Sequence, residues 1–187
     1  MANVISGWDW GPILTTCGPC KEVRLESYKA RLEDLRIDYE VSADPNKVTG
    51  KITAVVEGNA GDEVKFSASL DGDKVFDGSA SLDDKGEAEV EFHVSNPKLW
   101  YPHGYGKQPL YTVSATLVQD GNEFHSISKR TGFRKTELVQ TPDAVGKTFY
   151  FRVNGVDIFC GGSDWIPADS FVSVNKRTWI VSNCLLI

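Results

Sequence analysis

Between residues 31 and 140 the sequence alternates apolar and polar residues with a period of two, and short turn signals interrupt the alternation. Three runs show it best, with apolar positions at Val64, Phe66, Ala68 and Leu70, at Ala88, Val90, Phe92 and Val94, and at Tyr111, Val113, Ala115 and Leu117. Such strands bury one face and expose the other. Roughly seven short strands within about a hundred residues predict an antiparallel, immunoglobulin-like β-sandwich.

Two features of this middle region have more than one interpretation. Leu32 and Leu35 have the spacing of a helical face, but the alternation of Leu35, Ile37, Tyr39 and Val41 favours a strand. His93 and His125 fall at strand positions, where we expect surface residues rather than metal ligands. Asp120-Gly121-Asn122 predicts a hairpin.

The first thirty residues break the pattern. They hold a turn rich in tryptophan, around Trp8 and Trp10, and one or two strands, of which the alternation of Val23 and Leu25 marks one. This is too little chain to close a sheet.

The pattern also breaks after Pro142. Phe149, Phe151 and Val153 predict a strand, Asn154-Gly155 a turn, and the apolar run at 156–160 suits a strand buried on both faces, as in a parallel barrel. The chain therefore predicts one whole domain between two incomplete ones.

Composition excludes several functions. The net charge of −6 and the absence of a basic cluster argue against nucleic acid as a partner. No apolar run is long enough to span a bilayer, and the N-terminus lacks the regions of a signal peptide, so we expect no membrane partner and a cytoplasmic location. The four scattered cysteines and three distant histidines predict no disulfide framework, no metal site and no cofactor.

The segment TCGPCK at 16–21 has the letters of a thioredoxin-like dithiol. A reactive pair needs a preceding buried strand and a following helix, and the flanks of Cys17 and Cys20 supply neither. We expect two ordinary reduced thiols there, and a dithiol oxidoreductase stays the third alternative.

Three regions carry longer motifs: GWDWGP at 7–12; NPKLWYP at 96–102 with TGFR at 131–134; and FRVNG at 151–155 with GGSDWIPADSF at 161–171. Together they resemble the β-mannosidases of the second glycoside hydrolase family. Two departures stand out: Cys20 occupies a position where relatives usually carry tryptophan, and residues from Ser173 onward no longer resemble the family.

The resemblance implies a domain plan. Residues 1–28 would end an N-terminal sugar-binding jelly-roll sandwich, 29–141 would form the immunoglobulin-like sandwich, 142–172 would begin a (β/α)8 catalytic barrel, and 173–187 would be a divergent tail. The expected fold class is all-β, with the central sandwich flanked by remnants of the other two domains. We expect the chain to be a fragment of such an enzyme.

The resemblance also implies the chemistry, which is retaining hydrolysis of terminal non-reducing β-D-mannosyl residues. That reaction needs two carboxylates about 5 to 5.5 Å apart, and in the family both are glutamates on later barrel strands. We therefore predict no catalytic residue in this chain and no activity of the chain alone. Asp9, Trp10, Trp165 and Asp169 would contact the mannoside, and Arg134 is expected to form an interdomain ion pair.

The second alternative is a non-catalytic β-sandwich that binds carbohydrate or another protein, because immunoglobulin-like sandwiches host many functions. If the chain is a fragment of such a glycosidase, we expect exposed apolar side chains outside residues 31–140, where neighbouring strands would be missing.

Overall fold

The computed structural model describes residues 22–42, 46–58 and 63–162. Residues Tyr28–Cys160 form one compact unit. Within the described ranges the regular structure is entirely β, and these ranges contain no helix that could cross a membrane. The predicted all-β class is confirmed for this part of the chain.

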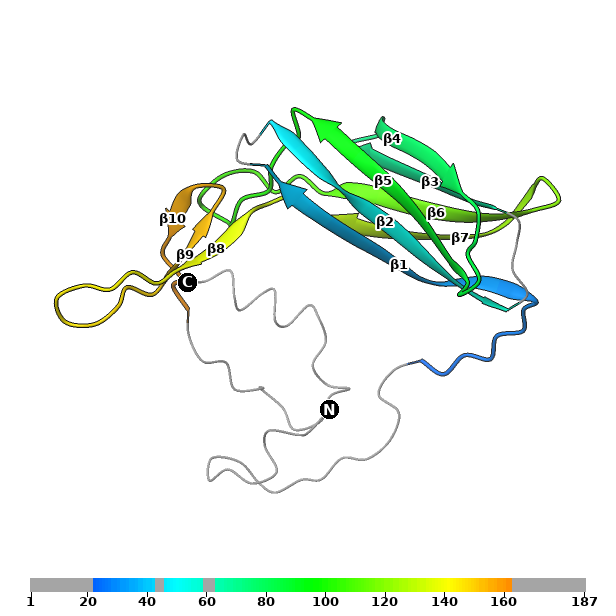
Figure 1. Ribbon diagram of the computed structural model, residues 1–187, viewed down its shortest axis with the longest axis horizontal. Coiled ribbons are helices and arrows are strands. Elements are labelled where there is room, and N and C mark those ends of the chain that lie inside the picture. Colours follow the sequence, from blue (N-terminus) through cyan, green and yellow to red (C-terminus); the bar gives the residue numbers. More distant parts are fainter. Residues whose placement is uncertain (1–21, 43–45, 59–62, 163–187) are drawn as a thin grey trace, which may run out of the picture. The chain divides into compact units, whose positions relative to one another are not determined.

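Two antiparallel sheets form the sandwich (Figure 1). The first has the order β1-β2-β5 and consists of β1 (Ala30–Val41), β2 (Lys47–Gly58) and β5 (Glu87–Ser95). The second has the order β4-β3-β6-β7 and consists of β3 (Glu63–Leu70), β4 (Asp73–Ala80), β6 (Tyr111–Gln119) and β7 (Asn122–Thr131). Seven strands in a three-on-four arrangement match the predicted immunoglobulin-like architecture.

The sequence alternation determines which face of each strand is buried. In β3 the even-numbered residues Val64, Phe66, Ala68 and Leu70 are buried, while their neighbours are exposed or half-buried. Strands β5 and β6 follow the same alternation, except that Val90 is only half-buried and that Val118, next to Leu117, is also buried. Because a shift of one residue would turn every apolar side chain to the solvent, the alternation also fixes the pairing register.

Three two-residue turns join hairpins, and each has both residues at positive φ, as a type I′ turn requires. They are Asp71-Gly72 between β3 and β4, Asp120-Gly121 between β6 and β7, and Asn154-Gly155 further along the chain. Aspartate, asparagine and glycine tolerate this region of backbone space better than other residues. The hairpin predicted at Asp120 is confirmed.

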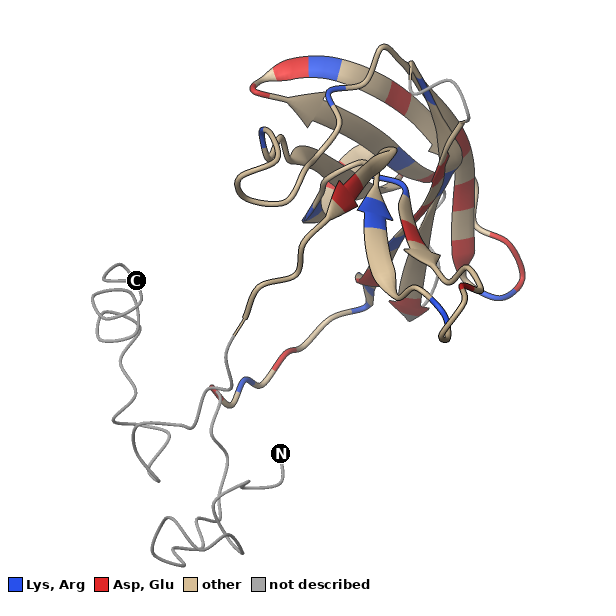
Figure 2. Ribbon diagram, turned by 90° about the vertical axis from the view of Figure 1, so that its left-hand side faces the viewer, with Lys and Arg blue, Asp and Glu red and all other residues tan. Residues whose placement is uncertain are grey.

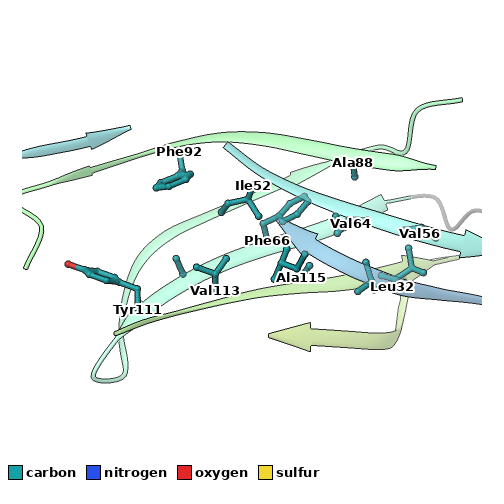
Figure 3. Packing of buried hydrophobic residues seen from close by; sticks show 14 of the residues in the cluster. Leu32, Ile52, Val56, Val64, Phe66, Ala88, Phe92, Tyr111, Val113 and Ala115 are labelled. Atoms are coloured by element: carbon teal, nitrogen blue, oxygen red, sulfur yellow. The ribbon is translucent and has the colours of Figure 1, made fainter. Parts of the chain in front are cut away.

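The core lies between the two sheets (Figure 3). Ile52, Ala88 and Phe92 from the first sheet face Phe66 and Val113 from the second. At one end, Phe133 is 1% exposed and its ring lies 4.5 Å from that of Tyr111, 5.0 Å from Tyr39 and 6.1 Å from Phe92, measured between centroids. Phe133 lies two residues after the end of β7, so these aromatic contacts hold the chain in place where it leaves the sandwich.

A β-bulge explains the spacing of Leu32 and Leu35. The pairing of β1 with β2 shifts between Leu32 and Asp34, and the extra residue turns both leucines inward, where they are 3% and 1% exposed. The choice of strand over helix is confirmed.

The open side of the sandwich is closed by contacts from β7 to β1. His125 Nδ1 accepts a hydrogen bond from the Leu32 backbone N–H at 3.1 Å, and Lys129 Nζ donates to Asp34 Oδ1 at 2.5 Å. His125 is half-buried. His125 was expected to be a surface residue rather than a ligand, and the structure adds a role: its ring accepts a bond from a backbone donor in the bulged strand.

A third antiparallel sheet, in the order β10-β9-β8, lies beyond one end of the sandwich (Figure 1). It comprises β8 (Thr136–Val139), β9 (Tyr150–Val153) and β10 (Val156–Ile158). The expected strand at 156–160, buried on both faces in the manner of a parallel barrel, is not what the structure shows: β10 pairs antiparallel with β9, and Val156 and Phe159 are exposed. The Asn154-Gly155 turn forces this reversal.

Near the N-terminus, residues 22–29 form no strand, and Val23 and Leu25 are exposed. The strand expected there is absent from the described residues, because a short alternating run gains little without a partner strand. In the view of Figure 2, acidic and basic residues are interspersed along the ribbon of the sandwich.

Candidate functional site

The predicted substrate-binding residues Asp9, Trp10, Trp165 and Asp169 lie outside the described ranges, and so do Cys17 and Cys20. Their roles stay predictions. In the described part of the chain, no group of three or more His, Cys, Asp or Glu residues is placed to hold a metal ion.

None of the described carboxyl groups whose pKa clearly departs from its ordinary value is a candidate for a catalytic acid. A glycosidase acid needs a pKa raised above its ordinary value. Every described carboxyl whose pKa clearly departs is instead shifted down, mostly by a cationic or hydroxyl partner: Asp34 by Lys129, Glu57 by Tyr28 and Arg31, Asp83 by the Glu87 backbone N–H, Glu89 by Lys51, and Asp157 by Arg152. Asp34, Glu57, Glu89 and Asp157 each pair with a residue of another strand, and Asp83 closes its own turn.

An open hollow is lined by residues of β1, β2 and β5, among them Asp38, Lys51 and His93. Most of its lining residues are charged or polar. Of the Phe92 and Tyr39 rings that border it, Phe92 is buried, and the Tyr39 hydroxyl donates to the Gly132 carbonyl at 2.9 Å. A sugar stacks on an exposed aromatic face. This hollow therefore gives no support to a carbohydrate-binding module.

The residues of two predicted motifs meet instead where the sandwich joins the third sheet. We call this region the junction and define it by Trp100, Gly132, Arg134, Lys135 and Asn154. The backbone N–H of Trp100 donates a hydrogen bond to the Phe133 carbonyl at 2.8 Å. Gly132 makes this approach possible, because a Cβ there would lie 2.8 Å from three side-chain atoms of Trp100.

Arg134 covers the same indole. Its guanidinium carbon lies 4.8 Å from the centroid of the Trp100 ring, within the range of a cation–π contact. Tyr39 supports this turn from β1, since its hydroxyl accepts the Arg134 backbone N–H at 3.4 Å. The interdomain ion pair expected of Arg134 stays a prediction, and the contact that the structure gives it is aromatic.

Asn154 connects the three chain segments that meet at the junction. Its backbone N–H donates to the Lys135 carbonyl at 2.9 Å, and its Oδ1 accepts the Lys135 N–H at 2.8 Å. Its Nδ2 donates to the Trp100 carbonyl at 3.0 Å. One side chain in the β9–β10 turn therefore ties this hairpin to the segment after β7 and to the loop after β5.

A second tie comes from the loop at 101–108. Gln108 Nε2 donates to the carbonyls of Tyr101 and Gly106, at 3.0 and 2.7 Å, and so closes the loop on itself. Tyr105 then accepts the backbone N–H of Phe159 on its hydroxyl at 2.9 Å. The chain just after β10 is therefore bound to this loop, and the turn just before β10 is bound to the junction through Asn154.

The base of the same segment is fixed from the core. The Tyr111 hydroxyl, at the start of β6, accepts the Lys98 backbone N–H at 2.8 Å, and burial raises the pKa of this tyrosine. A tyrosine at this place that bonds back to the upstream chain is similar to the tyrosine corner of immunoglobulin-like domains. The segment that leads to the junction is thus bound to the buried core of the sandwich.

The sequence motifs mark the segments that meet at the junction, but they do not reveal the contacts between them. Asn154-Gly155 was predicted only as a turn, and its amide contacts join residues 54 and 19 positions away, which no local pattern reveals. Gly132 could have been suspected, because a buried glycine beside an aromatic residue often marks a close approach.

The fold and the junction define an immunoglobulin-like sandwich that continues at one end into a further sheet held at a fixed place. The family model for glycosyl hydrolases family 2 matches residues 30–134, which span β1 to the Arg134 turn. The chain therefore belongs to glycosyl hydrolases family 2.

Individual relatives support this family assignment. Over 180 residues the chain is 49% identical to β-mannosidase B of Aspergillus clavatus, covering 93% of this chain and 21% of that protein. It is also 49% identical over 177 residues to β-mannosidase B of Thermothelomyces thermophilus, with 92% and 21% covered. The crystal structure of a β-D-mannosidase from Dictyoglomus thermophilum superposes with a TM-score of 0.81 at 32% identity, over 95% of this chain and 22% of that one. The chain spans about a fifth of the length of the relatives it matches.

Proposed function

We propose that this chain forms the immunoglobulin-like sandwich and adjoining segments of a β-mannosidase, a retaining glycoside hydrolase acting on terminal non-reducing β-D-mannosyl residues. The observation that carries the proposal is the 49% identity to β-mannosidase B over 93% of the chain. The matching fold of the D. thermophilum β-D-mannosidase supports it.

Within such an enzyme the described part acts by positioning. It contains no carboxyl with a raised pKa among the clearly shifted groups, but it has a junction that fixes where the chain leaves the sandwich. Positioning matters for rate, because a displacement of about 1 Å in an active site can cost about a hundredfold. Asp9, Trp10, Trp165 and Asp169 would contribute the mannoside contacts, and no cofactor takes part. A cytoplasmic location stays part of the proposal.

The alternative is a stand-alone β-sandwich that binds carbohydrate or protein. The engaged rings at the hollow of the first sheet give it no support. A mannoside bound by the chain alone would revive it.

A replacement experiment tests the proposal. The matched fifth of A. clavatus β-mannosidase B is exchanged for this chain, and release of p-nitrophenol is measured from the β-mannoside and, as a control, from the β-galactoside. We expect the chimera to hydrolyse the β-mannoside selectively and the 187-residue chain alone to hydrolyse neither. A folded chimera without β-mannosidase activity would contradict the proposal, as would turnover by the chain alone after contaminating hydrolases are removed.

A further inference from the structure

The chain that follows β10 is held through its backbone. Phe159 comes directly after β10, and its side chain is 84% exposed, so packing of the ring does not fix the chain at this point. Its backbone N–H donates a hydrogen bond to the Tyr105 hydroxyl at 2.9 Å. The two residues are 54 positions apart, so this bond joins the third sheet to the loop between β5 and β6.

The loop that presents Tyr105 is held in one shape by its own contacts. The Tyr101 backbone N–H donates to the Lys107 carbonyl at 2.9 Å, and Gln108 closes the loop as described above. Gly106 allows the Tyr101 ring to pack against the backbone, because a Cβ there would lie 2.9 Å from that ring. The Tyr105 hydroxyl is therefore a preorganised acceptor, which binds at a lower entropic cost than a mobile one.

Two attachments fix the direction of β10, whereas one would leave a pivot. Asn154 binds the turn before β10 to the Trp100 carbonyl, and Tyr105 binds the chain just after it. The two attached residues, Asn154 and Phe159, are five positions apart, which is about 17 Å along an extended strand. Because β9 and β10 are only four and three residues long, the hairpin can turn about the Asn154 end when the second bond is absent.

The direction of the chain at Phe159 matters for the proposed function. Trp165 and Asp169, which are predicted to contact the mannoside, follow Phe159 by six and ten residues. Six residues span at most about 20 Å, so the place of Trp165 depends on where the chain leaves β10. A displacement of about 1 Å in an active site can cost about a hundredfold in rate.

We propose that Tyr105 is a positioning residue of the β-mannosidase. Its hydroxyl sets the direction in which the chain leaves β10 and, through that direction, the place of the mannoside contacts. This inference rests on the proposed function for the identity of the reaction. It goes further in assigning to one side chain of the sandwich an effect on rate that is exerted through the backbone of Phe159.

Tyr105→Phe in the 187-residue chain tests the attachment. The variant keeps the aromatic ring and removes the acceptor. In hydrogen exchange followed by NMR, we expect the Phe159 amide to exchange at least about tenfold faster than in the unsubstituted chain, with the amides of β3 unchanged. Equal exchange of the Phe159 amide in the two proteins would overturn the proposal.

The same variant in the chimera tests the effect on the reaction. We expect kcat/KM for p-nitrophenyl β-mannoside to fall at least about tenfold while the Tm hardly changes, because water can replace the acceptor at this exposed place. A merely structural role would lower the Tm and leave the kcat/KM of the folded enzyme unchanged.

Tyr28→Phe is the matched control. Tyr28 is 42% exposed against 39% for Tyr105, and its hydroxyl also makes a hydrogen bond, to Glu57 at 2.6 Å. It precedes β1, whose start lies at the end of the sandwich remote from the third sheet (Figure 1). We expect this variant of the chimera to keep its full kcat/KM. Equal losses in the two variants would contradict the proposal.

A double-mutant cycle with Trp165→Ala identifies the path of the effect. If Tyr105 acts through the segment that carries Trp165, the double variant should be about as active as Trp165→Ala alone, whereas independent effects would multiply. Multiplied losses would contradict the proposal. An inactive parent chimera means that the proposed function fails, and the positioning role with it. An active parent with an equally active Tyr105→Phe variant overturns the positioning role alone.

Discussion

The Asn154 side chain donates a hydrogen bond from Nδ2 to the carbonyl oxygen of Trp100 at 3.0 Å, and the two residues are 54 positions apart in the sequence. The same side chain accepts the Lys135 N–H at 2.8 Å. Asn154 makes both contacts while its backbone, at φ 50°, forms the first position of the two-residue turn between β9 and β10. The turn therefore reverses the chain and also attaches the hairpin to the sandwich.

Substitution of Asn154 separates these two roles. Asn154→Gly keeps the positive φ but loses both side-chain hydrogen bonds, and we expect a loss of about 1 to 3 kcal/mol in the free energy of unfolding. Asn154→Ala should cost about 1 kcal/mol more, because alanine is strained in the left-handed region. Urea unfolding measures both values. An unchanged Asn154→Gly variant would show that the amide contacts add nothing.

Gly132→Ala tests the close packing of Trp100. The added methyl group would lie 2.8 Å from the indole side chain in a buried place, and we expect overpacking to cost about 1 to 3 kcal/mol. Gly146→Ala is the matched control, because a Cβ at that exposed position meets nothing within 4 Å. Thermal unfolding should show a lower Tm for the first variant only. A stable Gly132→Ala would mean that the indole can move aside freely.

The fold was predictable where the signal is local. Alternation specified the faces of β3, β5 and β6, and Asp-Gly and Asn-Gly pairs specified the hairpin turns, because each depends on residues next to one another in the chain. The alternation at Val23 misled because a strand also needs a partner. The apolar run after Asn154 misled because composition does not reveal pairing direction.

The junction was predictable only as a set of motifs. The resemblance marked Trp100, Arg134 and Asn154 as belonging to recognisable segments, but their contacts with one another depend on the finished sandwich. The role of His125 was hidden for the same reason, since the Leu32 N–H that it accepts becomes available only through the bulge in β1.

The ion pair between Asp34 and Lys129 predicts how stability changes with pH. The bond from Lys129 lowers the pKa of Asp34 in the folded state, so the pair stabilises the fold above the unfolded pKa of about 3.9. This contribution should be complete above about pH 5 and be lost as the pH falls through the lowered pKa. Urea unfolding between about pH 6 and pH 3 measures the slope.

A double-mutant cycle isolates this pair. We expect Asp34→Asn to reduce the loss of stability in acid, and Lys129→Gln to reduce it similarly, with no further change in the double variant. Because the pair lies on the surface, salt should weaken the effect. Equal acid sensitivity of Asp34→Asn and the unsubstituted chain would mean that other carboxyl groups control acid unfolding.

Limited proteolysis of the 187-residue chain with a protease of low specificity tests most directly whether the junction makes the sandwich and the third sheet one folded unit. We expect a resistant core with ends near Tyr28 and Cys160. A cut in the exposed loop around Val145 should leave both pieces together in native mass spectrometry, because the β8–β9 pairing and the contacts of Asn154 and Tyr105 still hold them. A core that ends near Lys135, with β8, β9 and β10 digested away, would contradict this view of the protein.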